Sequence, residues 1–144
     1  MLNVVVVDDS VLMRNNIKSY VEELGHKVVG EAENGIVAVE MCSKLNPDII
    51  TMDITMPDMD GITAIKKIRE FNTDVNIIIS TSHGQENIIM QSLQAGAKGY
   101  ILKPMNKDKL SDIIDNIYQT KSNDEEEYLL DDWFRWYRNK KFYM

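Results

Sequence analysis

Four short apolar runs in this chain each end in polar side chains that could do chemistry. The runs are Leu2–Val7, Ile49–Met52, Val75–Ile79 and Gly99–Leu102. In that order, they are followed by Asp8 and Asp9; by Asp53; by Ser80, Thr81 and Ser82; and by Lys103. Runs of this length, rich in β-branched residues, are typical of buried strands. If the strands are parallel, these polar groups all lie at one edge of a sheet, where open α/β sheets bind ligands.

The chemistry that such a group of side chains favours is phosphoryl transfer to a carboxylate. Three carboxylates in one place repel one another and raise one another's pKa unless positive charge lies between them. Lys103 supplies one positive charge, and a hard divalent cation such as Mg²⁺, which binds carboxylates, carbonyls and water, would supply the rest. The remaining carboxylate can then attack phosphorus to form an aspartyl phosphate. A hydroxyl from the end of the fourth strand would donate to a phosphoryl oxygen.

The elements that must position these groups follow from a regular alternation of strand-like and helix-like segments. The expected strands are Leu2–Val7, Lys27–Ala32, Ile49–Met52, Val75–Ile79 and Gly99–Leu102. The expected helices run from a cap at Asp9 or Ser10 to about Leu24, then over Ile36–Leu45, Ile62–Phe71, Glu86–Ala95 and Lys107–Tyr118. Five βα units with short loops predict an α/β fold, a doubly wound five-stranded parallel sheet with helices on both faces. The second strand is the most polar, so we expect it at an edge.

Composition and charge exclude several classes of function. The 144 residues, 44% of them hydrophobic, suit one globular domain. The formal net charge of −7 argues against binding to a nucleic-acid backbone. No apolar stretch approaches the roughly 20 residues of a membrane span, and no basic leader precedes the first strand. Cys42 is the only cysteine, which excludes an intramolecular disulfide. We therefore expect a cytoplasmic protein that neither binds DNA nor inserts into a membrane.

Together, these motifs resemble the receiver domain of two-component response regulators, over residues 1 to about 120. The matching residues are Asp8-Asp9-Ser10 with Met13-Arg14, Asp53 with Met56–Gly61, Thr81, Ala95-Gly96-Ala97, Tyr100 and Lys103-Pro104. The resemblance implies a flavodoxin-like fold with strand order 2-1-3-4-5. It implies that this domain covers residues 1–120 and that residues 121–144 form a separate C-terminal extension.

The resemblance also assigns roles to individual residues. It implies that Asp53 is the phosphoacceptor. It implies a Mg²⁺ ion bound directly by Asp9, Asp53 and the Thr55 carbonyl, and by Asp8 through water. It further implies that Lys103 contacts the phosphoryl group, that Thr81 and Tyr100 form a switch, and that the Lys103–Pro104 peptide is cis. From its position in an apolar run alone, Tyr100 would be a core aromatic with its hydroxyl at the surface.

Within that family, three segments look most like the stand-alone chemotaxis regulators: Thr51–Pro57, Gly84-Gln85 and Gln94–Lys98. The implied partners are a sensor histidine kinase and a target protein bound only after phosphorylation, of which the flagellar motor switch is one candidate. The alternative is a phosphorelay or non-flagellar regulator that acts through its C-terminal extension. Both interpretations describe a binding switch that can dephosphorylate itself, not an enzyme acting on external substrates.

Two other functions on the same fold can be compared with this one. A phosphatase or phosphotransferase with an aspartate nucleophile would need a second acid two residues after Asp53, where Thr55 stands. A flavin or nucleotide carrier would need a phosphate cradle after the first strand, but the sequence there is Asp-Asp-Ser-Val. A DNA-binding output domain would need more than the roughly 24 residues that follow the receiver.

The C-terminal extension has its own pattern. After acidic residues 124–127, the apolar residues Leu130, Trp133, Phe134 and Tyr137 recur at helical spacing. A helix this short is marginal in water unless its aromatic face is buried. We therefore predict a short helix docked on protein, either on its own receiver domain or on a second copy in a homodimer. A partner protein, a membrane surface or a nucleic acid are the alternative ligands for this face.

Overall fold

The computed structural model describes residues 1–56, 59–82 and 84–119. Its strands are β1 (Asn3–Val7), β2 (Lys27–Ala32), β3 (Ile49–Asp53), β4 (Asn76–Thr81) and β5 (Gly99–Leu102). Its helices are α1 (Val11–Glu23), α2 (Gly35–Leu45), α3 (Gly61–Phe71), α4 (Glu86–Ala95) and α5 (Lys107–Gln119). The predicted C-terminal extension lies outside the described residues, so its helix stays a prediction, as does the domain boundary at residue 120.

The strands form one parallel sheet in the order β2-β1-β3-β4-β5. This confirms the α/β class and the strand order that the resemblance implied. It also places the polar strand β2 at an edge, as its composition indicated. Among the described residues, no helix is long and apolar enough to cross a membrane.

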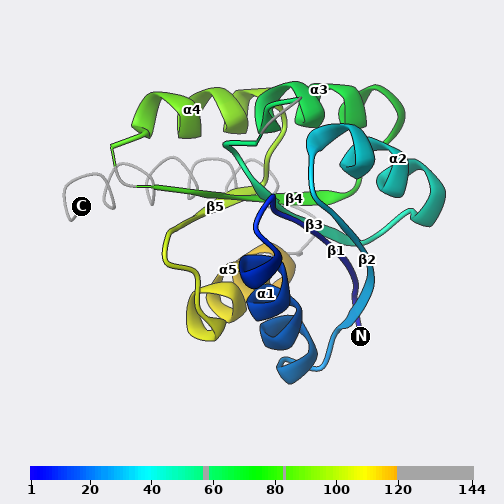
Figure 1. The fold of residues 1–144 in the computed structure, drawn as a ribbon, viewed down its shortest axis with the longest axis vertical. Coiled ribbons are helices and arrows are strands. Elements are labelled where there is room, and N and C mark those ends of the chain that lie inside the picture. The colour runs from blue at the N-terminus through cyan, green and yellow to red at the C-terminus, as the bar shows by residue number, and fades with distance from the viewer. Residues whose placement is uncertain (57–58, 83, 120–144) are drawn as a thin grey trace.

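Helices cover both faces of the sheet (Figure 1): α2, α3 and α4 lie on one side, and α1 and α5 on the other. Successive residues of a strand point to opposite faces. Val5 and Val7 accordingly pack in the core beneath α2–α4, whereas Val4 and Val6 pack in the core beneath α1 and α5. Because both faces are covered, the central strands β1, β3 and β4 are apolar over most of their length, which is why they could be recognised as buried strands.

The helix ends follow their capping residues. Ser10 caps α1, since its hydroxyl accepts a hydrogen bond from the Met13 N–H at 3.2 Å, which decides between the two caps that the sequence allowed. The Asn34 side chain caps α2, which therefore begins at Gly35, one residue before the predicted start. Gly25 follows α1 with a φ of +87°, a conformation that favours glycine.

The apolar residue Leu12 of α1 is not in the core. Leu12 is 70% exposed, whereas Ile17 and Val21 are buried. At about 100° per residue, Leu12 lies roughly 140° around the helix from Ile17, so it falls outside the stripe that faces the sheet.

Candidate functional site

The predicted site residues meet at the carboxyl edge of the sheet. Asp8 follows β1 directly, Asp53 is the last residue of β3, Thr81 is the last residue of β4, and Lys103 follows β5. The strands β3 and β4 thus extend through polar residues that the sequence placed just beyond them, with Asp53 paired to Ser80 in the ladder. The parallel topology brings residues nearly a hundred positions apart to one place, as predicted.

Asp53 is a buried carboxylate with two donors on it. Only 4% of its surface is exposed. The Thr55 N–H donates to Oδ1 at 3.1 Å, and Lys103 Nζ lies 3.3 Å from Oδ2. Burial raises the pKa of Asp53, while the Thr55 N–H and the Lys103 charge act to lower that pKa. The carboxylate is therefore oriented and desolvated, with a positive charge at one oxygen.

Three carboxylates gather here. One oxygen each of Asp8, Asp9 and Asp53 lies within 4.8 Å of the others. Asp8 and Asp53 are buried and Asp9 is exposed. Burial is the largest cause of the raised pKa of Asp8, and the Asp53 and Asp9 charges raise that pKa further. The repulsion among the carboxylates that the sequence predicted is therefore present, but it raises the pKa of Asp8 less than desolvation does.

These residues fit a hard cation. Asp8 Oδ1 accepts a hydrogen bond from the Ser10 N–H at 2.9 Å. Asp8 Oδ2 is buried and has no hydrogen-bond partner among the described residues. A buried carboxylate oxygen without a partner is costly, and a cation coordinated by the cluster would satisfy it. Oxygen donors from several carboxylates match the preference of Mg²⁺.

Thr55 and Gly61 shape the loop that follows Asp53. Thr55 is exposed, with its N–H directed to Asp53; the predicted role of its carbonyl as a metal ligand stays a prediction. The Gly61 N–H donates to the Ile54 carbonyl at 3.1 Å. A Cβ on Gly61 would lie 2.9 Å from the Ile54 Cα. Glycine thus permits α3 to begin directly against the end of β3.

The two predicted switch residues are both buried. Thr81 is 1% exposed, and its hydroxyl donates to Gln85 Oε1 at 2.5 Å. Tyr100 is also 1% exposed and packs in the core beneath α2–α4. Its hydroxyl is buried as well, which differs from the surface position that its place in an apolar strand suggested. The cis Lys103–Pro104 peptide that the resemblance implied is present.

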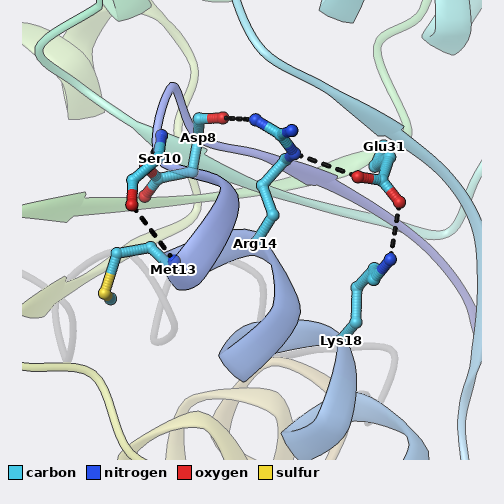
Figure 2. Close-up of polar contacts among 6 residues, drawn as sticks. All are labelled: Asp8, Ser10, Met13, Arg14, Lys18 and Glu31. Atoms are coloured by element: carbon cyan, nitrogen blue, oxygen red, sulfur yellow. Dashed lines mark hydrogen bonds and ion pairs between the residues drawn. The ribbon is translucent and has the colours of Figure 1, made fainter.

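Gln85 and Arg14 were each noted from the sequence only as part of a motif, without a role. Gln85, at the start of α4, accepts a hydrogen bond from the Thr81 hydroxyl. Its position four residues after Thr81 was the available signal. Arg14 Nη1 donates to the Asp8 carbonyl at 2.7 Å (Figure 2).

Sequence comparisons relate this chain to known proteins. The profile of the response regulator receiver domain family matches residues 4–115. Chemotaxis protein CheY of Bacillus subtilis (strain 168) is 44% identical over 77% of this chain and 92% of its own length. Chemotaxis protein CheY of Halobacterium salinarum is 45% identical over 79% of this chain and 94% of its own length.

Solved structures show the same fold. The CheX-CheY-BeF3-Mg+2 complex from Borrelia burgdorferi contains a chain that matches with a TM-score of 0.77 and 34% identity, covering 81% of this chain and 88% of that one. The receiver domain of NarL from Mycobacterium tuberculosis matches with a TM-score of 0.77 and 29% identity, covering 83% and 98%. With the family profile spanning most of its length and these relatives aligned almost end to end, the chain belongs to the response regulator receiver domain family.

Proposed function

We propose that this protein is a chemotaxis-type response regulator that accepts a phosphoryl group on Asp53 and thereby changes which protein it binds. The observation that carries the proposal is the position of Asp53. It is buried, held by the Thr55 N–H and Lys103, and adjacent to Asp8 and Asp9. No other carboxylate in the described residues combines burial, a lysine partner and two neighbouring carboxylates.

The reaction is a displacement at phosphorus. A carboxylate oxygen of Asp53 forms the new O–P bond, while the bond between phosphorus and the donor group breaks and the electron pair stays with the donor. The hydrogen bond from the Thr55 N–H to Oδ1 fixes the orientation of the Asp53 carboxylate. Lys103, 3.3 Å from Oδ2, neutralises charge on the transferred group. Burial excludes water and strengthens both interactions.

Asp8, Asp9, Asp53 and the Thr55 carbonyl would hold the Mg²⁺ ion, with Asp8 acting through water. When bound, Mg²⁺ supplies positive charge to the phosphoryl oxygens and offsets repulsion among the carboxylates. The protein's part is to hold its oxygen ligands in place before the ion arrives, so that binding costs little rearrangement.

Thr81 would couple phosphorylation of Asp53 to a change in conformation. In the structure its hydroxyl is engaged with Gln85. A phosphoryl group on Asp53 offers a charged acceptor, which binds a hydroxyl more strongly than a neutral amide oxygen does. Movement of Thr81 toward Asp53 would release Gln85 and alter the packing of α4 and of Tyr100 in β5. The negative charge of a phosphoryl group on Asp53 would thus shift the equilibrium between two packing arrangements of α4 and Tyr100.

The relatives support the chemotaxis assignment and name a type of partner. Relatives from Bacillus subtilis, Thermotoga maritima and Halobacterium salinarum, each aligned over at least 92% of its own length, carry the name chemotaxis protein CheY. The Borrelia burgdorferi structure holds such a protein with CheX. We propose a sensor histidine kinase as the phosphoryl donor and a target that binds the phosphorylated form, with the flagellar motor switch as the first candidate. The protein would not turn over external substrates.

A second candidate function follows from a different relative. Transcriptional regulatory protein YdfI of Bacillus subtilis is 40% identical over 80% of this chain, which covers 54% of YdfI. A receiver of this type therefore also occurs in a regulator of transcription. This supports the alternative of a phosphorelay or non-flagellar regulator that acts through residues 121–144.

The assignment of Asp53 is tested by mass spectrometry after incubation with a small acyl phosphate and Mg²⁺. The wild type should gain one phosphoryl group, about 80 Da, and Asp53→Asn should gain nothing. Asp74→Asn is the matched control, because Asp74 is an exposed carboxylate just before β4, at the opposite edge of the sheet. Labelling of Asp53→Asn to the wild-type extent would show that another residue is the acceptor.

A further inference from the structure

We propose that Arg14 is a positioning residue for the magnesium site, holding the backbone between Asp8 and Asp9 in the orientation that the ion requires. The inference rests on the proposed function of that site. Figure 2 shows the contacts that carry it. Arg14 lies in the first turn of α1, and its side chain is only 11% exposed. Its Nη1 donates to the Asp8 carbonyl at 2.7 Å, and its Nε donates to Glu31 Oε1 at 3.0 Å.

The backbone of Asp8 is held on both sides. Its N–H donates to the Ala32 carbonyl of β2 at 3.1 Å, and its carbonyl accepts from Arg14. That carbonyl belongs to the same planar peptide as the N–H of Asp9. Arg14 therefore fixes the orientation of the peptide plane between Asp8 and Asp9. Asp9 is the exposed member of the three carboxylates, and its position depends on that plane. Without Arg14, this peptide could rotate and carry Asp9 out of the cluster.

Arg14 is itself held in place. Glu31, on the edge strand β2, accepts from Arg14 through Oε1 and from Lys18 Nζ through Oε2 at 2.6 Å. The planar guanidinium can donate in two directions at once, to a carbonyl and to a carboxylate. A lysine ammonium is a point charge on a flexible stem and cannot reproduce that geometry. Hydrogen bonds thus connect Lys18 to Glu31 and Glu31 to Arg14, and Arg14 is the member of this network that contacts Asp8.

Charge and positioning predict opposite effects on Mg²⁺ affinity. If Arg14 acted only as a positive charge near three carboxylates, removing it would make the site more negative and tighten Mg²⁺ binding. If Arg14 holds the Asp8–Asp9 peptide, removing it loosens a ligand and weakens binding. Outer contacts that orient metal ligands typically change affinity by about ten-fold or more when they are lost. The sign of the change therefore decides between the two roles.

The experiment is calorimetric titration of the full chain with MgCl₂, with folding of each variant checked by circular dichroism and thermal unfolding. Arg14→Met and Arg14→Lys should each bind Mg²⁺ about ten-fold more weakly than the wild type. Lys18→Met is the matched control, since it removes a positive charge from the same network without touching Asp8; its affinity should stay unchanged or rise slightly. Unchanged or tighter binding by Arg14→Met, or wild-type affinity in Arg14→Lys, would overturn the inference. So would equal weakening in Lys18→Met.

A second readout separates ligand positioning from damage to Asp53. The rate of labelling by a small acyl phosphate is measured in Arg14→Lys as the Mg²⁺ concentration rises. The mid-point should shift to higher Mg²⁺, while the rate at saturation should return to that of the wild type. A saturating rate that stays low would contradict positioning. If the wild type itself binds no Mg²⁺, the proposed function fails; if it binds and Arg14→Met binds equally well, only this inference fails.

Discussion

At the scale of single residues, the pKa of a side-chain carboxyl group depends on where that group lies in this protein. Asp53 and Asp8 are buried, and their pKa values are raised by desolvation. Glu31 is exposed, and the Lys18 and Arg14 hydrogen bonds lower its pKa. The buried pair is suited to binding a cation. The exposed glutamate instead anchors the arginine that reaches Asp8.

The lowered pKa of Glu31 predicts a pH-dependent contribution to stability. Its folded pKa lies below the ordinary value of 4.5, so the stabilisation is fully present above that value and is lost as pH falls through the folded pKa. Because Glu31 is largely solvent-exposed, we expect Glu31→Gln to cost less than about 1 kcal/mol at pH 7. The difference from wild type should be smaller at pH 3 than at pH 7.

Urea unfolding without Mg²⁺, at both pH values, measures this contribution. Raised salt should shrink the difference at pH 7, because partly exposed ion pairs are screened. Glu33→Gln is the control, an exposed carboxylate next to β2 outside the Arg14–Glu31–Lys18 network. A Glu31→Gln difference that is equal at pH 3 and pH 7 would show that charge is not its cause.

At the scale of elements, α4 is held at both ends by contacts of different kinds. At its start, Gln85 accepts from the Thr81 hydroxyl. At its end, Arg69 of α3 donates to the Gly96 carbonyl through Nε at 3.1 Å and Nη2 at 2.6 Å. Gly96 has a φ of +124°, and a Cβ there would lie 2.8 Å from Arg69 Nε. The contact at the start involves Thr81, the proposed switch residue, whereas the contact at the end does not. We therefore expect α4 to respond to phosphorylation at its start.

Thr81→Ala tests that coupling. The variant keeps Lys103 and the three carboxylates Asp8, Asp9 and Asp53, so it should still be labelled by an acyl phosphate. It lacks the hydroxyl that would move from Gln85 to the phosphoryl group, so phosphorylation-dependent partner binding should be lost. The measurement is a pull-down with and without beryllofluoride, a mimic of the acyl phosphate, with the bound protein identified by mass spectrometry.

Ser92→Ala is the matched control for Thr81→Ala. Ser92 is also fully buried, and its hydroxyl donates to the Ile88 carbonyl within α4. It should retain regulated binding, since its hydroxyl bonds only within the helix and does not reach the site. Regulated binding that survives intact in Thr81→Ala would refute the role of Thr81 in switching.

At the scale of the whole molecule, the sheet separates two cores, and the site lies at the carboxyl edge of that sheet. The core beneath α2–α4 includes Tyr100, and the core beneath α1 and α5 includes Ile17 and Leu110. If Tyr100 is a switch residue, as the resemblance implies, we expect a change at the carboxyl edge to reach the core beneath α2–α4 and not the core beneath α1 and α5. The helix α5 ends at Gln119, where the described part of the chain also ends.

Residues 121–144 carry the remaining prediction at this scale. Their pattern predicts an aromatic helical face, including both tryptophans, buried against protein. Deleting residues 124–144 should therefore lower the melting temperature if the face packs on its own receiver domain, or shift the oligomer in sedimentation if it packs on a second copy. Unchanged values for both, together with fully solvent-exposed tryptophan fluorescence in the intact chain, would contradict docking and favour an external partner.

The sequence by itself determined the alternation of elements and the edge at which the site forms. Both depend on local signals: β-branched runs, helical spacing and capping residues identify each element, and five βα units leave little choice but a parallel sheet. Parallel strands then put Asp8, Asp53, Thr81 and Lys103 at one edge. The strand order, by contrast, was available only from the resemblance, because local patterns do not state which strands are neighbours.

Only the tertiary structure decided which side chains act together at that edge. The contact of Arg14 with the Asp8 carbonyl requires α1 to lie at one angle to β1 and β2. The burial of the Tyr100 hydroxyl depends on how the helices on that face of the sheet, α2, α3 and α4, pack against it. Such contacts are set by the relative placement of elements to within an ångström or so, and a one-dimensional pattern of residue types carries no information at that precision. Sequence periodicity identifies the face of an element, and packing alone identifies the atom that each side chain meets.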